Sequence, residues 1–472
     1  MSTHRYSHVI GVLALVLGST ALGVRAQAPP DAAEEAPAPA VEDGAAADGL
    51  RSLYVPGGLS PDRAVKEVID TSPDLKRTQA LVQEAKGGAM QAMAALVPTL
   101  ELQGRYTRLS PVDNPSFDIP GLGPLSFPSL TEQTATDATL AYSFTRSLAE
   151  AMPAYRAAKK SKEAAYHQIQ AELNDVAFDG RQAYYEYARA EAGLAVANFA
   201  LEAAVSQREE TEALVGAGSA ARVDLMRVQA QEEAARVAVE RGKLGVQVAT
   251  RALQTLMHTE ELPTLGEDLS EEVMGIPTET EENLLERAYQ DRPDLKALLT
   301  YIEVTEHQLK SAKGSGAPDV LARGSVQYSN PNLRVIPQEQ RFASTWEVSA
   351  VIRWTPNGTV AASGRAHELK AALQQAEADT QLMKDAIRVE VAQGYHGVLA
   401  ARSAIESARL GLEAAQEGYR VTREQLQAGI VNTTTLLQAQ AELIRAQVDV
   451  VESAIGIRVA KAQLKRAIGE MP

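Results

Sequence analysis

The chain has 472 residues, of which 45% are hydrophobic, 23% charged and only 5% aromatic. This composition indicates a folded chain, and the small aromatic share favours closely packed helices over one thick globular core. The formal net charge of −15 argues against nucleic acid as a partner, because phosphate binding needs clustered Lys and Arg. The sequence contains no Cys, which excludes disulfides, thiol nucleophiles, Cys-ligated metals and a lipid anchor on Cys.

The first residues have the pattern of an export signal. Arg5 supplies a basic start, a short apolar run follows, and Ala26-Gln27-Ala28 has the small residues of a cleavage site, so we predict a signal peptide over 1–28. Residues 29–58 form an acidic, Ala/Pro-rich lead-in that we expect to be disordered. No later stretch reaches about 18 uninterrupted apolar residues, which leaves an exported soluble protein or an outer-membrane β-barrel.

The rest of the chain is internally repeated. Ser72-Pro73-Asp74-Leu75-Lys76 recurs as Arg292-Pro293-Asp294-Leu295-Lys296, and Gly218 has its counterpart in Gly429. Self-similarity at such a spacing indicates two copies of one structural unit. The predicted organisation is a first repeat, a linker and a second repeat over residues 59–258, 259–280 and 281–470.

Each repeat is predicted to contain a helix, a strand, a loop, a second strand, a very long helix, a tight turn and a final helix. At 1.5 Å per residue each long helix would measure about 100 Å, so its apolar seam cannot be buried inside one compact domain. In the second one, apolar and small residues recur at alternating spacings of four and three, which predicts coiled-coil packing. Shorter helices such as 73–97 and 221–258 should then lie end to end along one long helix. The predicted strands lie near 99–109, 135–146, 319–329 and 343–355, and the predicted long helices over 147–215 and 360–427.

The strand candidates alternate apolar and polar residues. Trp346 and Trp354, which are eight residues apart on one face, would be separated by about 26 Å. An outer-membrane barrel has an apolar band of about 25 Å with aromatic residues at both edges. We therefore predict a membrane aromatic girdle made of Tyr106, Tyr142, Phe144, Tyr328, Trp346 and Trp354.

The strands leave two questions open: whether they form a soluble sheet or a membrane barrel, and how many chains would share the barrel. A soluble antiparallel sheet with one buried face has the same alternation. In a membrane, four strands would leave two unpaired edges, which hydrocarbon does not tolerate, so the barrel would have to be shared between chains. Two copies would supply eight strands and three copies twelve.

The second tight turn and the start of the last helix have a motif that resembles the TolC-type outer-membrane efflux proteins. The motif is Gln425-Leu426-Gln427-Ala428-Gly429-Ile430 followed by Leu436-Leu437-Gln438-Ala439-Gln440, in a duplicated chain with two β-hairpins. The resemblance implies a mainly α fold with a β-barrel contribution: a homotrimer with a shared 12-stranded outer-membrane barrel and a long coiled-coil α-helical periplasmic tube. It also implies a passive exit duct of a tripartite efflux pump or type I secretion system, which docks to a periplasmic adaptor (membrane fusion protein) and an inner-membrane pump.

The resemblance further implies two functional regions. The turns with Gly216, Gly218, Gly429 and Ile430 match the family's adaptor-contact tips. The periplasmic gate candidates are Asp224, Arg227, Thr435 and Gln438. Thr435 and Gln438 stand where the family usually has acidic residues, whereas Asp224 matches a family gate residue, and Arg227 can pair with it along one helix face. We expect a weaker cation-attracting ring than in acidic-ring relatives. We also expect Thr433 to Thr435 to begin the last helix and to be able to cap it.

No catalytic, metal or cofactor site is predicted. The seven His residues are scattered singly, without metal-ligand spacing, and no phosphate-binding or nucleophile motif is present. Two other classes of protein remain as alternatives: a periplasmic adaptor, for which we would expect one hairpin between β domains, and a secreted coiled-coil scaffold. The exported substrate is not specified by these patterns.

Overall fold

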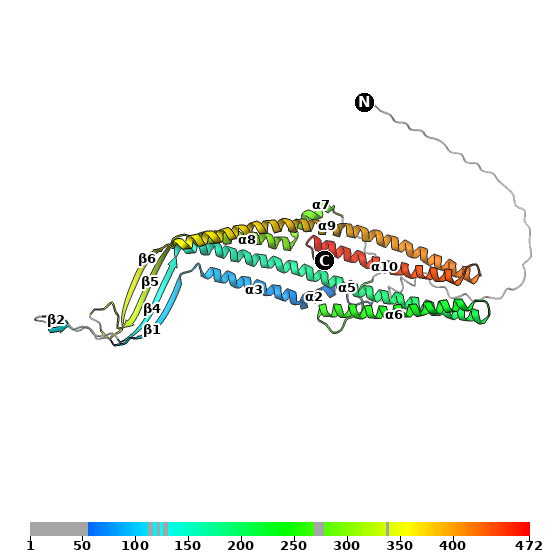
Figure 1. Ribbon diagram of the computed structural model, residues 1–472, viewed down its shortest axis with the longest axis horizontal. Helices are drawn as coiled ribbons and strands as arrows, with labels where there is room; N and C mark the ends of the chain where they lie inside the picture. The colour runs from blue at the N-terminus through cyan, green and yellow to red at the C-terminus, as the bar shows by residue number, and fades with distance from the viewer. Residues whose placement is uncertain (1–54, 112–116, 120–122, 126–130, 269–277, 337–338) are drawn as a thin grey trace, which may run out of the picture. The chain divides into compact units, whose positions relative to one another are not determined.

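The computed structural model describes residues 55–111, 117–119, 123–125, 131–268, 278–336 and 339–472. The predicted signal peptide and most of the lead-in lie outside the described residues. The described part consists of long helices that adjoin one β-sheet (Figure 1).

The main sheet has four antiparallel strands in the order β1-β4-β5-β6. The strands are β1 (Thr99–Arg108), β4 (Glu132–Ser143), β5 (Asp319–Asn330) and β6 (Ala343–Arg353). One hairpin comes from each repeat, and they join where β4 pairs with β5, with Ala138 opposite Val326. β1 and β6 are therefore edge strands. In addition, β2 (Phe117–Ile119) and β3 (Gly123–Leu125) pair within the first hairpin's loop, where no strand was predicted.

Two long helices organise the helical part. They are α5 (Met152–Gly216) with 65 residues and α9 (Pro356–Gln427) with 72 residues, or about 98 and 108 Å at 1.5 Å per residue. The shorter helices α3 (Pro73–Ala94) and α6 (Arg222–Met257) both pack on α5. In the second repeat α8 (Pro293–Gly314) and α10 (Thr433–Ala467) pack on α9 in the same way. Each shorter pair thus covers successive parts of one long helix (Figure 1).

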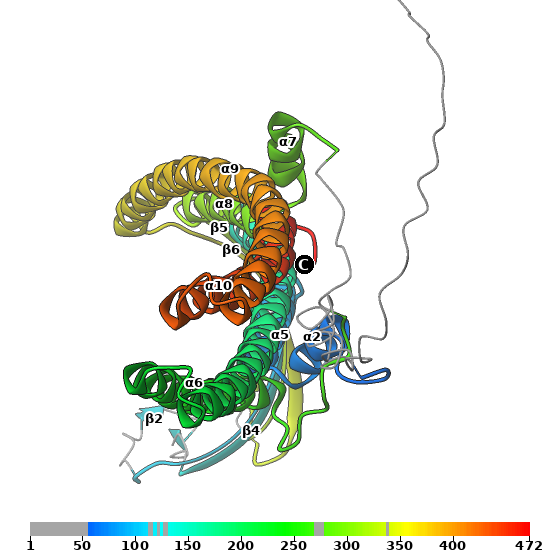
Figure 2. The same cartoon turned by 90° about the vertical axis from the view of Figure 1, so that its right-hand side faces the viewer.

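The helices follow a curved arrangement when viewed from the end where α5 and α6 meet (Figure 2). Two short helices, α2 (Pro61–Thr71) and α7 (Glu281–Asp291), pack on α5 and α9 respectively. Buried residues form two clusters, one with Tyr184 and Leu253 and the other with Leu295 and Ile387. The first cluster also contains Val451 and Ile455 of α10, so it joins the two repeats.

The transition from β4 to α5 differs from the prediction. Phe144 was expected in a strand, but β4 ends at Ser143 and Phe144–Arg146 form the short helix α4. Ser143 caps α4 by accepting a hydrogen bond from the Arg146 N–H at 3.3 Å. A π-helical turn, Ser147–Ala151, follows before α5, since Pro153 has no N–H to donate to the carbonyl four residues earlier.

The repeated Pro-Asp-Leu-Lys motif marks a helix start in both repeats, with Pro73 and Pro293 as the first residues of α3 and α8. In the second repeat, Arg292 donates from Nη2 to Asp294 Oδ2 at 2.6 Å and from Nη1 to the Ala467 carbonyl at 3.2 Å. It also pairs with Glu390 of α9. Arg292 therefore joins the α7–α8 corner to α9 and α10.

Candidate functional site

The ends of α5 and α9 have the same hydrogen-bonded turn. At the first tip the Ser219 N–H donates to the Leu214 carbonyl at 2.9 Å, and at the second the Ile430 N–H donates to the Gln425 carbonyl at 2.8 Å. Each bond spans five residues around a glycine with positive φ, +76° at Gly218 and +71° at Gly429. This is the Schellman helix end, in which a left-handed glycine lets the chain reverse. Gly216 lies in the last turn of α5, without positive φ.

The helices that leave the two tips begin differently. α10 is capped by Asn432, whose Oδ1 accepts from the Thr435 N–H at 3.0 Å. The prediction that Thr433 to Thr435 begin this helix is confirmed, because α10 starts at Thr433. The prediction that they cap it was wrong by one residue, because the cap is Asn432. α6 begins after Ala221, which has no side-chain cap. Ile430 at the second tip is 73% exposed.

The gate candidates are only partly brought together. Arg227 Nη1 lies 3.3 Å from Asp224 Oδ1 within α6 and also donates to Thr434 Oγ1 of α10 at 3.1 Å. Arg227 thus links the helical hairpin of α5 and α6 to that of α9 and α10 within one chain. The Thr435 hydroxyl instead donates to Asn432 at 3.2 Å, and Gln438 is exposed. Sequence reasoning missed Thr434, although it is adjacent to Thr435, the counterpart of Asp224.

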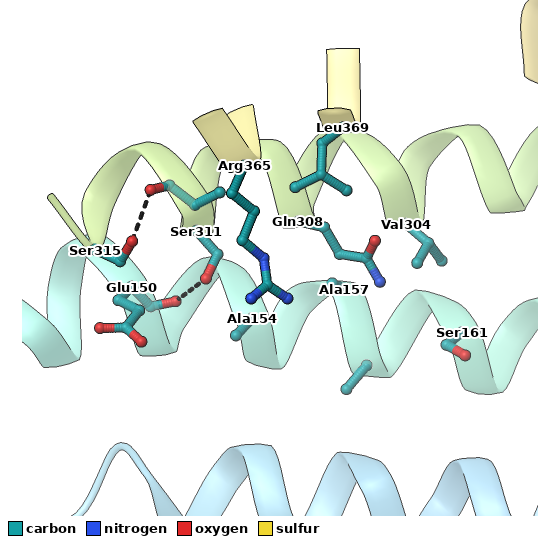
Figure 3. Close-up of a pocket in the computed structure, with 12 residues that line it drawn as sticks. Glu150, Ala154, Ala157, Ser161, Val304, Gln308, Ser311, Ser315, Arg365 and Leu369 are labelled. Atoms are coloured by element: carbon teal, nitrogen blue, oxygen red, sulfur yellow. Dashed lines mark hydrogen bonds between the residues drawn. The ribbon is translucent and has the colours of Figure 1, made fainter. Parts of the chain in front are cut away.

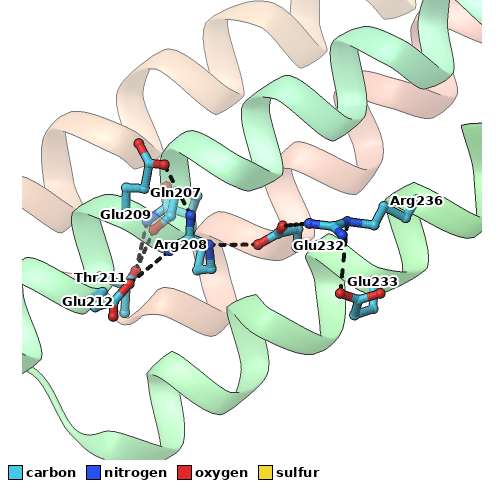
Figure 4. Close-up of polar contacts among 8 residues, drawn as sticks. All are labelled: Gln207, Arg208, Glu209, Thr211, Glu212, Glu232, Glu233 and Arg236. Carbon is cyan, nitrogen blue, oxygen red and sulfur yellow. Dashed lines mark hydrogen bonds and ion pairs between the residues drawn. The ribbon is translucent and has the colours of Figure 1, made fainter.

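A larger polar cluster lies between α5 and α6 (Figure 4). Glu232, with a side chain only 8% exposed, accepts from Arg208 Nε at 2.7 Å and from Arg236 Nη2 at 2.5 Å. The Arg236 hydrogen bond, with that of Arg208, lowers the pKa of Glu232. In the second repeat the positions equivalent to Arg208, Glu232 and Arg236 hold Tyr419, Leu443 and Gln447. This charged cluster is therefore confined to the helical hairpin of α5 and α6.

The outer face of the sheet is apolar and exposed. Trp346, Val348 and Ile352 are 73%, 76% and 76% exposed. The predicted girdle residues lie in two groups along the strands: Tyr106, Tyr328 and Trp346 are near the β-hairpin loops, and Tyr142, Phe144 and Trp354 are near the helices.

The group near the helices is held by specific contacts. Phe144 packs edge-on against Tyr142, with ring centroids 4.9 Å apart. Trp354 follows the last residue of β6, and its Nε1 donates to Thr359 Oγ1 of α9 at 3.0 Å. Both residues thus lie where the strands end and the helices begin.

A cleft of about 440 Å³ lies between α5, α8 and α9 near the sheet (Figure 3). The hydroxyl groups of Ser311 and Ser315 donate to the carbonyls of Glu150 and Ala312 at 2.9 and 2.8 Å. Arg365 reaches in from α9. No His or Cys is among the lining residues, and hydroxyls that donate to carbonyls are not activated nucleophiles.

Neither a membrane-spanning helix nor a metal-binding cluster is present in the part of the chain that the structure describes. None of its helices combines the length and the apolar composition needed to cross a membrane. No group of three or more His, Asp or Glu side chains in that part is arranged to hold a metal ion.

The model of one protein family, described as outer membrane efflux protein, matches residues 64–258 and 284–470. The chain belongs to the outer membrane efflux protein family. This efflux protein is therefore located in the outer membrane, as predicted, and the predicted fold class of a duplicated, mainly helical chain with a strand contribution is confirmed. The search of curated protein sequences finds no match.

Solved structures of outer-membrane channels have the same fold as this efflux protein. The CmeC outer membrane channel of Campylobacter jejuni matches with a TM-score of 0.73 at 14% identity, over 93% of this chain and 94% of that chain. The MtrE outer membrane channel of Neisseria gonorrhoeae matches with 0.72 at 17% identity, over 87% and 89%. A structure of CusC matches with 0.73 at 16% identity, over 89% and 94%.

Proposed function

We propose that this outer membrane efflux protein is a homotrimeric channel that acts as the passive exit duct of a tripartite efflux pump or a type I secretion system. The observation that carries the proposal is the sheet: its outer face is apolar and exposed, and the edge strands β1 and β6 each have one side without a partner strand among the described residues. In hydrocarbon both edges must be paired, and three copies would close a barrel of 12 strands. Solved structures described as outer-membrane channels share this fold, which supports a channel.

A secreted coiled-coil scaffold is less favoured. A scaffold in water would be expected to bury the face with Trp346 and Ile352, because contiguous apolar patches on soluble proteins are rarely this large. The experiment is purification of the full chain with and without detergent, followed by conductance in planar bilayers. Detergent-dependent trimers with stepwise conductance support the duct. Recovery from the aqueous fraction without detergent, and no conductance, would favour the scaffold.

We propose that Asp224 and Arg227 contribute to the periplasmic gate, near Thr435 and Gln438. The only acid among these four is Asp224, and Arg227 partly neutralises it at 3.3 Å. Binding of multivalent cations at this end should therefore be weak in the native channel and depend on Asp224. Block by trivalent cations added from the periplasmic side is measured in Asp224→Ala and in the native channel. Strong block that survives the substitution would contradict this gate.

We also propose that the two tips contact a periplasmic adaptor. Ser219 and Ile430 flank the left-handed glycines, and Ile430 exposes an apolar side chain to solvent. Because the native chain has no Cys, Ser219→Cys and Ile430→Cys each introduce a single attachment point for a cross-linker. The adaptor should be captured at both tips but not by Glu240→Cys, farther along α6. Equal capture at Glu240 would argue against docking through the tips.

A further inference from the structure

The helix ends near the sheet carry mostly positive formal charge. Between β4 and α5, Arg146 of α4 and Glu150 of the π-helical turn pair at 3.3 Å and offset each other. Beyond them, segments 85–97, 152–162, 307–316 and 356–367 of α3, α5, α8 and α9 lie near the four strands. They contain one, four, two and one Lys or Arg, and no Asp or Glu. The whole chain, by contrast, has 61 acidic and 46 basic residues. We call these four segments the basic zone.

Several cations of the basic zone lack an acidic partner. Lys160 pairs with Glu163 and with Glu303 of α8, at 3.0 and 2.8 Å. Lys159, Lys310 and Lys313 are exposed, and no ion pair links them to any acid among the described residues. The helix dipole favours Lys313 in the last turn of α8, but it does not account for Lys310 or Lys159. These side chains present unneutralised charge to their surroundings.

A half-buried neighbour, His307, experiences the same positive potential. The pKa of His307 is lowered, first by burial and then by the charges of Lys310 and Arg156. The acids on its own helix, Glu303 and Glu306, act in the opposite direction without outweighing them. The positive charge here is therefore not cancelled by the acids nearby.

The basic zone begins directly beside the aromatic girdle. Trp354 donates to Thr359 Oγ1, and that hydroxyl donates to the Gly316 carbonyl at 2.9 Å, which ties the tryptophan to the end of α8. Lys313 and Lys310 precede Gly316 by three and six residues, or about 4.5 and 9 Å along a helix. Lysines near an aromatic girdle extend their ammonium groups toward headgroups.

We propose that the basic zone binds anionic phospholipid headgroups of the leaflet adjacent to the helices, with Lys310 and Lys313 as its main contacts. This rests on the proposed channel, in which Trp354 lies at a membrane surface. Phosphate is the complementary charge, and each lysine close to an anionic surface contributes about fivefold to binding. The effect falls off over roughly 8 Å at physiological ionic strength. Lys313, about 4.5 Å from Gly316 along the helix, lies within that range, and Lys310, at about 9 Å, lies at its limit.

The test uses the two tryptophans of the chain. Trp346→Phe leaves Trp354 as the reporter, and Trp346 is exposed, so no core is opened. The trimer is reconstituted into phosphatidylcholine vesicles that contain either brominated phosphatidylglycerol or brominated phosphatidylcholine, and fluorescence quenching is compared. We expect several-fold stronger quenching by the brominated phosphatidylglycerol than by the brominated phosphatidylcholine. In the Lys310→Gln/Lys313→Gln variant, and in 0.5 M salt, the two lipids should quench equally.

One control variant and three possible outcomes complete the test. Lys243→Gln removes a lysine of α6 that pairs with Glu240 at 2.8 Å and should leave the lipid preference unchanged. Equal quenching by both brominated lipids in the parent overturns the proposal. An altered anion selectivity of the double-lysine variant, with unchanged lipid preference, also overturns it and places these lysines along the conducting path. Absence of quenching by either lipid means instead that the sheet is not in the bilayer, and it is the channel proposal that fails.

Discussion

The two glycines of the first tip should respond to alanine in opposite directions. Gly218 has φ +76°, whereas Gly216 lies in the last turn of α5, and a Cβ added at either position meets no atom within 4 Å. Steric contact with neighbours is therefore excluded at both, and only backbone conformation differs. A left-handed residue with a side chain costs about 1–2 kcal/mol, while alanine in a helix gains up to about 1 kcal/mol over glycine.

The readout is hydrogen exchange of the Ser219 N–H, which closes the turn by donating to the Leu214 carbonyl. Gly218→Ala should speed its exchange by about 5- to 30-fold, because 1.4 kcal/mol corresponds to a factor of ten. Gly216→Ala should slow it or leave it unchanged. Gly429→Ala should reproduce the Gly218 effect at the Ile430 N–H. Equal exchange in the two variants of the first tip would refute the argument from φ.

Three further predictions concern stability. Asn432→Ala should weaken the start of α10 by about 0.5–2 kcal/mol, and Ala221→Asp should strengthen that of α6 by a similar amount, as measured by exchange of the first-turn amides. Burial acts to raise the pKa of Asp294, but the hydrogen bond and charge of Arg292 outweigh burial and lower that pKa. The ionised Asp294 therefore stabilises the folded chain above the unfolded pKa of about 3.9, and this contribution is lost as pH falls through the folded pKa. The acid-induced drop in trimer melting temperature should accordingly be smaller in Asp294→Asn. Ala350→Arg, midway between the tryptophans on the outer face, should destabilise the membrane-inserted trimer by about 2–4 kcal/mol, whereas Ser349→Arg on the opposite face should be tolerated, as urea unfolding in vesicles would reveal.

Much of the fold was predictable because its signals are local. Proline at the starts of α3 and α8 and glycine at both tips determine where helices begin and reverse. The alternation of apolar and polar residues determines which face of the sheet is apolar. The boundary at Phe144 was not predictable from alternation, because the Ser143 cap and Pro153 shape the chain there through hydrogen bonding.

The candidate gate was predictable only in part. The Asp224–Arg227 pair follows from the spacing of three residues along a helix. The bond from Arg227 to Thr434 joins residues 207 positions apart, and no local pattern indicates such a contact. The Arg208–Glu232–Arg236 cluster was missed for the same reason, because charged residues on amphipathic helices are usually solvated and their burial depends on the neighbouring helix.

Local chemistry in the chain is therefore sufficient for the duplicated order of helices and strands, the turning glycines and the apolar outer face, since each depends on residues a few positions apart. The remaining features of the fold depend on packing between segments that are distant in the sequence. It decides which strands lie at the edges of the sheet, which charges become buried between α5 and α6, and which lysines near Trp354 remain without an acid. These features depend on which surfaces meet in space, and that is settled only when the long helices and the two hairpins come together.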